Sequence, residues 1–215
     1  RIERNWMTRT LWLSQSDHIH KVLKRFNMEN AKPTSTPLPT SIRLSDRDSP
    51  ATDKERELNG KIPYASAVGS IMYAMVATRP DLAYVVGVVS RYMSNPGKKH
   101  WEAVKHILRY LKGTLDAQLT FGSTTSIDVE GYTDSDYARN TDNRKSTSGY
   151  IFTYGGGAIS WRSKLQECMA LSTTEAEYIA ASEAAKEAIW LHRLSADFGT
   201  KSRTDRPAST IYCDS

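Results

Sequence analysis

Residues 149–164, GYIFTYGGGAISWRSK, determine how the C-terminal half of the chain folds. Two runs rich in β-branched and aromatic side chains, at 150–154 and 158–161, flank three consecutive glycines. Such side chains favour strands, and glycine adopts the backbone angles that a tight hairpin turn requires. The stretch therefore predicts a β-hairpin.

Strand-like and helical segments flank this hairpin in a definite order. The segment IDVEGYTDSDYA at 127–138 precedes it and contains Asp134, while TIYCDS at 210–215 ends the chain and contains Asp214. A helical pattern runs from 173 to 198, between the hairpin and this last segment. A single helical crossover normally joins parallel strands of one sheet. We therefore expect the Asp134 and Asp214 strands to pair in parallel, with their C-terminal ends side by side.

The long helix carries two acids in its first turns, Glu175 and Glu177. At ~100° per residue these side chains point about 160° apart, so they do not serve one site. Ser172 and Glu175 have the spacing of a capping box, which assigns Glu175 to capping the helix. A carboxylate on the face of Glu177 requires a partner, because that face suits close packing on a sheet. The residues that share it are small or apolar: Ala180, Ala181, Ala184, Ala188, Leu191 and Ser195.

Asp134, Glu177 and Asp214 converge if the parallel pairing forms. Three carboxylates without a Cys or His cluster match hard cations such as Mg²⁺ or Mn²⁺. Two such ions can activate water and stabilise the leaving oxygen in phosphodiester hydrolysis. Strand periodicity puts Asp136 on the side of Asp134, where it is a further ligand, a residue behind the ligands or only a turn residue. The alternative is that these acids are unrelated structural residues.

Residues 1–113 divide into three segments by composition. Residues 1–30 combine a short strand with an amphipathic helix. Residues 31–63 contain several prolines among Ser, Thr and Asp and lack an apolar period, which predicts an extended connector. Residues 64–113 predict three helices.

The third of these helices, at 98–113, has an apolar stripe and a basic opposite face. The basic residues are Lys98, Lys99, Lys105, Arg109 and Lys112. One interpretation is an ordinary solvated face. The other is a surface that follows the phosphates of nucleic acid, because histidines and aromatic residues are interleaved with the positive charges.

Composition limits the class of protein. The chain has 215 residues, a formal net charge of +5 and 39% hydrophobic residues. The positive charge is compatible with an acidic partner such as nucleic acid. Its two cysteines, Cys168 and Cys213, predict neither a disulfide framework nor a zinc site and favour a reducing, intracellular setting. We expect no membrane span, no signal peptide, and a sequence cut at both ends from a longer polypeptide.

Three long stretches carry a resemblance to a known family. Residues 131–191, GYTDSDYARNTDNRKSTSGYIFTYGGGAISWRSKLQECMALSTTEAEYIAASEAAKEAIWL, closely resemble the ribonuclease H domain of copia-type LTR retrotransposon Pol polyproteins. Residues 11–38, LWLSQSDHIHKVLKRFNMENAKPTSTPL, resemble the segment that joins the reverse transcriptase of that family to its ribonuclease H. Residues 63–114, from PYASAVGS to YLKGT, resemble the same segment.

The resemblance implies an α/β (α+β mixed) fold: a ribonuclease H-like mixed sheet with a long crossover helix, preceded by a mainly helical thumb or connection segment. The implied domains are the end of the reverse transcriptase region (1–30), a linker (31–63), a helical connection (64–113) and a ribonuclease H-like domain (114–215). The implied reaction is two-metal hydrolysis of the RNA strand of an RNA/DNA hybrid during reverse transcription. The catalytic and metal-binding acids fall on Asp134, Glu177 and Asp214.

The implied partners are an RNA/DNA hybrid and the remainder of the Pol polyprotein. The implied location is intracellular: cytoplasmic virus-like particles, with the nucleus as the alternative. Family members continue past the third acid to a fourth carboxylate, so we expect the domain to be incomplete at its C-terminus, and the polymerase active site is not in this sequence. A non-catalytic nucleic-acid-binding module, or a relic with an incomplete site, is the alternative function. A third possibility is that residues 1–113 only position the nuclease.

Overall fold

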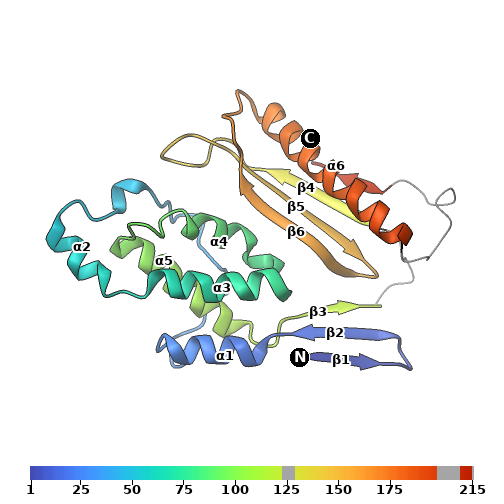
Figure 1. Ribbon diagram of the computed structural model, residues 1–215, viewed down its shortest axis with the longest axis horizontal. Coiled ribbons are helices and arrows are strands. Elements are labelled where there is room, and N and C mark those ends of the chain that lie inside the picture. The colour runs from blue at the N-terminus through green and yellow to red at the C-terminus, as the bar shows by residue number, and fades with distance from the viewer. Residues whose placement is uncertain (123–128, 198–208, 215) are drawn as a thin grey trace. The chain divides into compact units, whose positions relative to one another are not determined.

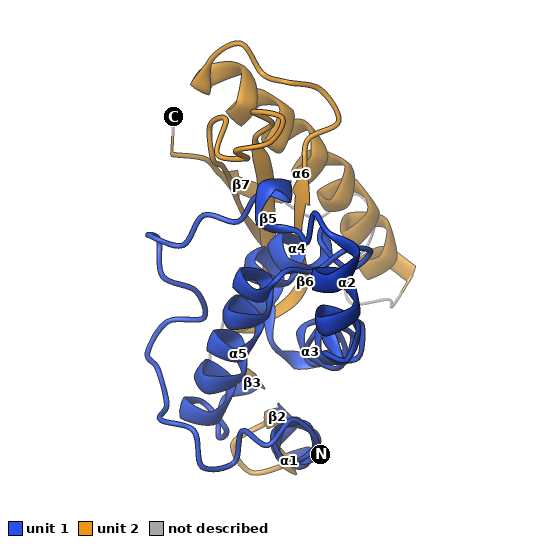
Figure 2. Ribbon diagram, turned by 90° about the vertical axis from the view of Figure 1, so that its left-hand side faces the viewer, with its two compact units in different colours: residues 1–3, 12–119 blue, residues 4–11, 120–215 orange. Residues whose placement is uncertain are grey.

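The computed structural model describes residues 1–122, 129–197 and 209–214, which form a mixed α/β structure as the sequence predicts (Figure 1). The chain divides into two compact units (Figure 2). Unit 1 comprises residues 1–3 and 12–119, and unit 2 comprises residues 4–11 and 120–215. No helix in the described part of the chain is long and apolar enough to cross a membrane.

Unit 1 is mainly helical, and its helices bury the apolar stripes that predicted them. In α3 the buried positions include Ala67, Val68, Ile71 and Ala74, a spacing that places them on one face. Together with residues of the other helices they form one hydrophobic core. The four longer helices of this unit with buried residues are α1 (Ser16–Arg25), α3 (Tyr64–Thr78), α4 (Ala83–Ser90) and α5 (Lys98–Gly113). A 3₁₀ turn, η2 (Pro80–Leu82), precedes α4.

The expectation of an extended connector at 31–63 is wrong in part, because this segment contains a 3₁₀ turn, η1 (Asp46–Asp48), and a helix, α2 (Asp53–Gly60). No residue of α2 is buried, so apolar periodicity could not reveal it. A capping box holds its first turn instead: Glu55 N–H donates to Thr52 Oγ1 at 3.3 Å, and Thr52 N–H donates to Glu55 Oε2 at 3.1 Å. The Thr-x-x-Glu spacing was the available signal.

A three-stranded sheet joins two strands from the start of the chain to one from residues 118–121, in the order β1-β2-β3. The short strand expected within residues 1–30 is present, whereas the first strand, which is exposed along its whole length, was not expected. The three strands are β1 (Ile2–Asn5), β2 (Thr10–Ser14) and β3 (Gln118–Phe121).

Unit 2 contains a four-stranded sheet with the order β6-β5-β4-β7. The predicted hairpin is confirmed, and Gly155 and Gly156 occupy its turn with φ angles of 58° and 83°. Such positive angles at both central residues match the twist of the flanking strands and favour glycine. The strands are β4 (Glu130–Ser135), β5 (Thr147–Tyr154), β6 (Gly157–Leu165) and β7 (Thr210–Tyr212).

Helix α6 (Thr173–Asp197) packs on one face of this sheet (Figure 1). Its contact with the strands is made by Ala184, Ala188 and Leu191, which gather around the fully buried ring of Phe152. Gly131 of the neighbouring strand also lies against this ring, since a Cβ added at Gly131 would lie 2.3 Å from it. The predicted sheet-facing side of the helix is therefore confirmed for these alanines, and residue 198, its predicted end, lies outside the described residues.

Candidate metal centre

The parallel pairing predicted for the two acid-bearing strands is present. Strands β4 and β7 pair in parallel, and the last residues in register are Tyr132 and Tyr212. Their rings stack with centroids 5.1 Å apart. Two residues further along each chain segment come Asp134 and Asp214, both exposed. Both carboxylates therefore lie near the C-terminal ends of these two strands.

Glu177 reaches the same strand ends from the first turns of α6. Its Oε1 accepts a hydrogen bond from the backbone N–H of Ser135 at 3.1 Å, so the end of β4 holds the carboxylate in place. One ligand atom each of Glu177, Cys213 and Asp214 lies within 4.8 Å of the others. The structure therefore brings two of the three predicted acids together and adds a thiol.

The charge around Glu177 is negative. Partial burial raises the pKa of the Glu177 carboxyl, and the nearby charges of Asp134 and Asp214 raise it further, while the bond from Ser135 opposes the rise. Carboxylates that repel one another in this way are stabilised by a bound cation.

The donor atoms allow a test of which cation fits. The carboxylate oxygens of Glu177 and Asp214 suit Mg²⁺ or Mn²⁺. Cys213 Sγ lies 3.8 Å from Glu177 Oε2, and a thiolate there would favour softer ions such as Zn²⁺. The residues therefore fit a divalent cation, with hard-ion ligands in the majority.

Asp134 and Asp136 are not in the group of ligand atoms within 4.8 Å. Along β4 the residues Gly131 and Thr133 are buried and Tyr132 and Asp134 are exposed, so Asp134 projects from the face opposite the Phe152 core. Asp134 still acts on the pKa of Glu177. Asp136 holds a turn: its Oδ1 accepts from Thr147 N–H at 2.6 Å.

The choice between the two helix acids follows the prediction. Ser172 Oγ accepts a hydrogen bond from Glu175 N–H at 3.1 Å, as expected for the N-cap of α6. The carboxylate of Glu175 accepts from the backbone N–H of Leu171 at 2.7 Å instead of from that of Ser172. Glu175 therefore caps the helix, and Glu177 is the acid that reaches the C-terminal end of β4.

Three of the five predicted phosphate contacts in α5 already have partners in the protein. Lys99 Nζ lies 3.0 Å from Asp48, and Lys105 Nζ lies 2.8 Å from Glu102. Arg109 Nε donates to the Lys32 carbonyl at 2.7 Å. These contacts favour a structural use of the basic face. Lys98 is exposed and Lys112 is half-buried.

Two residues near the ends of β4 and β7 were not found from the sequence, Cys213 and Gln166. Strict alternation would place Cys213 opposite Asp214, but β7 ends at Tyr212, so the alternation does not extend to either. Gln166 lies in the segment before α6, and its Nε2 is 3.3 Å from Ser135 Oγ. No spacing rule relates either residue to Glu177.

Comparison with known proteins identifies the family. The chain is 57% identical, over its full 215 residues, to the retrovirus-related Pol polyprotein from transposon TNT 1-94 of Nicotiana tabacum, of which it spans 16%. It is 53% identical over 130 residues to secreted RxLR effector protein 161 of Plasmopara viticola, covering 60% of this chain and 92% of that protein. The uncharacterized mitochondrial protein AtMg00810 of Arabidopsis thaliana is 34% identical over 180 residues, covering 84% and 72%.

The chain therefore belongs to the family of sequences related to retrotransposon Pol polyproteins. It spans about one sixth of the tobacco polyprotein. No protein-family model matches the chain, and no solved structure matches it.

Proposed function

We propose that this chain is the part of a retrotransposon reverse transcriptase/ribonuclease H that hydrolyses the RNA strand of an RNA/DNA hybrid in a metal-dependent reaction. The observation that carries the proposal is the meeting of Glu177 of α6 with Asp214, which follows β7, while Asp134 lies two residues beyond the last registered pair of the parallel strands β4 and β7. The family relationship to Pol polyproteins supports it. A ribonuclease H-like fold for unit 2 is part of the same proposal.

Asp134, Glu177 and Asp214 would hold Mg²⁺ or Mn²⁺, and two such ions would supply an activated water and compensate the negative charge of the leaving oxygen. In the overall reaction the water oxygen bonds to phosphorus and the P–O bond to one sugar breaks. The products are a phosphate monoester and a sugar hydroxyl. The backbone N–H of Ser135 fixes one oxygen of Glu177, so the other is directed toward Cys213 and Asp214.

The direct test is cleavage of a labelled RNA/DNA hybrid by the chain with Mg²⁺, with Mn²⁺ and with EDTA. Replacing a metal-bound acid should cost at least as much as replacing a residue behind the ligands, which typically costs about 10–100-fold. We expect Asp134→Asn and Glu177→Gln each to lower the cleavage rate at least about 100-fold. Glu175→Gln is the matched control, because its amide oxygen can still cap α6.

The outcome decides between hydrolysis and a second candidate function, nucleic-acid binding without hydrolysis. The position of Asp134 outside the close group of ligand atoms favours this second function. Cleavage that EDTA and both substitutions abolish supports the nuclease. Hybrid binding with no metal-dependent cleavage would refute it and leave the binding module.

A further inference from the structure

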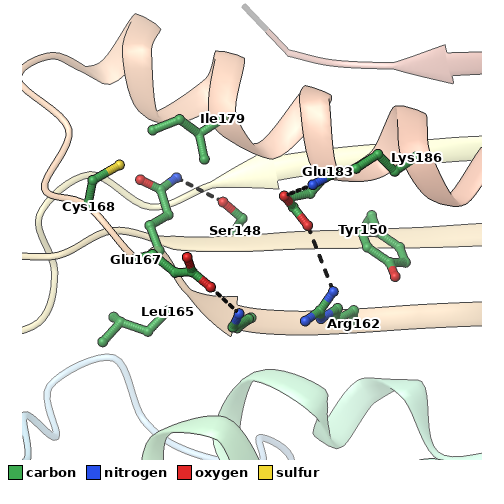
Figure 3. A pocket seen from close by; sticks show the side chains of 11 residues that line it. Ser148, Tyr150, Arg162, Leu165, Glu167, Cys168, Ile179, Glu183 and Lys186 are labelled. Carbon is green, nitrogen blue, oxygen red and sulfur yellow. Dashed lines mark hydrogen bonds and ion pairs between the residues drawn. The ribbon is translucent and has the colours of Figure 1, made fainter.

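A cavity of about 400 Å³ lies between α6 and strands β5 and β6, on the helix-covered face of the sheet (Figure 3). Its size lies within the range of small-ligand sites in proteins. Tyr150 and Ile179 provide apolar surface, and Arg162 and Lys186 provide positive charge from opposite walls. Cys168, whose thiol is exposed, lines one end.

The charges in the cavity do not balance. Glu183 forms ion pairs with both Lys186 and Arg162, the latter at 3.8 Å (Figure 3). Lys164 pairs separately with Glu167 at 2.9 Å. Among the residues that line the cavity, three cations thus face two carboxylates, so the lining carries a net charge of +1. Exposed pairs of this kind are weak, so an incoming anion can compete for the cations.

Gln166 supplies a second and independent feature of the cavity. Its side chain is almost completely buried, at 5% exposure, and its Nε2 donates to Ser148 Oγ at 2.8 Å and to the Ala176 carbonyl at 3.0 Å. Because a carbonyl only accepts, the amide orientation is fixed. The Oε1 atom is buried and has no hydrogen-bond partner among the described residues. A buried acceptor left in this state is costly unless a ligand or water donates to it.

We propose that this cavity binds one nucleotide of a nucleic-acid strand, with the phosphate between Arg162 and Lys186 and a sugar or base donor group on Gln166 Oε1. A phosphodiester carries the single negative charge that the cavity lacks, and the sugar or base supplies the missing N–H or O–H. Burial raises the pKa of the Tyr150 phenol, and the neighbouring Glu187 carboxylate, which accepts its hydrogen bond, raises it further.

The cavity is connected to the candidate metal centre. Gln166 Nε2 lies 3.3 Å from Ser135 Oγ, and the backbone N–H of Ser135 bonds to Glu177. As a substrate subsite of a nuclease the inference rests on the proposed function, although nucleotide binding can be measured without hydrolysis. A strand held here would lie next to the carboxylates.

The two exposed cysteines report on the two sites separately, because Cys168 lines the cavity and Cys213 lies beside Glu177. The experiment measures iodoacetamide alkylation of each cysteine by mass spectrometry, on the full chain in EDTA. The probes are a short single-stranded RNA, DNA of the same sequence, a nucleoside monophosphate and inorganic phosphate. At a strand concentration about ten times its Kd we expect Cys168 alkylation to slow about tenfold. With the nucleoside monophosphate, which fills only the cavity, Cys213 alkylation should change much less than that of Cys168.

Variants connect this protection to the cavity. Arg162 and Lys186 are exposed by 47% and 65%, so the double variant Arg162→Ala, Lys186→Ala should keep its fold. Loss of charged phosphate contacts should weaken strand binding about tenfold or more. The slope of log K against log salt should become shallower by about 0.7 per lost contact. Arg193→Ala is the matched control, an exposed arginine on the same helix outside this cavity.

Each outcome separates this inference from the nuclease proposal. Protection of Cys168 that the double variant removes supports the inference, whether or not the hybrid is cleaved. If strands protect Cys168 and the monophosphate does not, the ligand of the cavity is a nucleic-acid strand. If both protect it equally, the cavity accepts a single nucleotide whether or not it is part of a strand. Unprotected Cys168 with strand bound elsewhere overturns the inference, even if the hybrid is cleaved. Equal protection by inorganic phosphate also overturns it, since a bare anion site would then suffice.

Discussion

Unit 1 buries Arg79 and His100 almost completely, whereas unit 2 leaves Asp134 and Asp214 exposed at the end of two strands. Arg79 donates a bidentate pair of hydrogen bonds to the Asp81 carboxylate and further bonds to the carbonyl and hydroxyl of Thr114. Every one of these partners belongs to unit 1. In unit 2 the acids have few protein partners and repel one another.

The difference suggests that the two units use polar groups for different purposes. A buried charge that makes four hydrogen bonds within its own unit fixes one arrangement of the segments that supply them, and it is costly to disturb. Exposed acids grouped at a strand edge contribute little to folding and remain available to a ligand. We therefore expect unit 1 to act as a structural support and unit 2 to bind the ligand. Four measurements test this contrast.

The largest expected effect is that of Arg79→Met. The substitution leaves the Thr114 carbonyl and hydroxyl without their buried donor, while the Asp81 side chain, 36% exposed, keeps contact with solvent and the bond from the Tyr110 hydroxyl. We expect a loss of about 3 kcal/mol in the free energy of unfolding, the low end for a buried pair. Hydrogen exchange read peptide by peptide should show the loss in unit 1. Arg56→Met, in an exposed pair with Asp53, is the control and should cost no more than about 1 kcal/mol. Equal losses in both units would contradict the contrast.

Next in size is Gly131→Ala in unit 2. The added methyl group would lie 2.3 Å from the ring of Phe152, and overpacking of this kind costs about 1–3 kcal/mol. The midpoint of denaturant unfolding should therefore fall. Adding Phe152→Leu should recover part of the loss by making room. If the loss of stability in the double variant equals the sum of the two single losses, Gly131 and Phe152 are not in contact.

A smaller effect is expected from Ser172→Ala, which removes the N-cap of α6. The backbone N–H of Glu175 would lose its acceptor, and such a change costs about 1 kcal/mol. Thermal unfolding measures it, and Ser172→Asp should restore the cap. The hybrid-cleavage rate of Ser172→Ala, measured well below the unfolding temperature, should stay within about twofold of the parent because the cap does not touch the metal centre.

The smallest effect is a pH dependence in unit 1. Burial lowers the pKa of His100, while its bond to the Ser45 carbonyl opposes the shift. The neutral ring is needed because Nδ1 accepts from Gly97 N–H at 2.9 Å. A lowered pKa in the folded state means that this stability is present above the ordinary histidine pKa and is lost as pH falls through the folded value.

The melting temperature should therefore fall between neutral and mildly acidic pH, and hydrogen exchange should locate the change near the start of α5. In His100→Gln the pH dependence should be weaker, because no group at this position titrates. A parent chain whose unit 1 is equally stable at both pH values would show that the imidazole is not held neutral.

Local patterns predicted much of unit 2. The glycine-centred hairpin, the helix cap at Ser172 and the inward face of α6 follow from spacing, and the parallel strands follow from the single helical crossover between them. Such rules act over a few residues or a single connection, so they can be applied without coordinates. Helix α2 was missed because its capping box, and not apolar burial, defines it.

Helical and strand periodicity were enough to assign Glu177, and not Glu175, to the sheet-facing side and to place Asp134 and Asp214 at the ends of neighbouring strands. Which side chains meet there depends on the packing of segments that are distant in sequence. Cys213 joins Glu177 and Asp214 because the strand ends at Tyr212 and releases the next residues from alternation. Asp134 stands outside that close group because strand alternation still governs it. Gln166 reaches Ser135, β5 and α6 at once because three segments distant in sequence pack against one another, which no local pattern encodes.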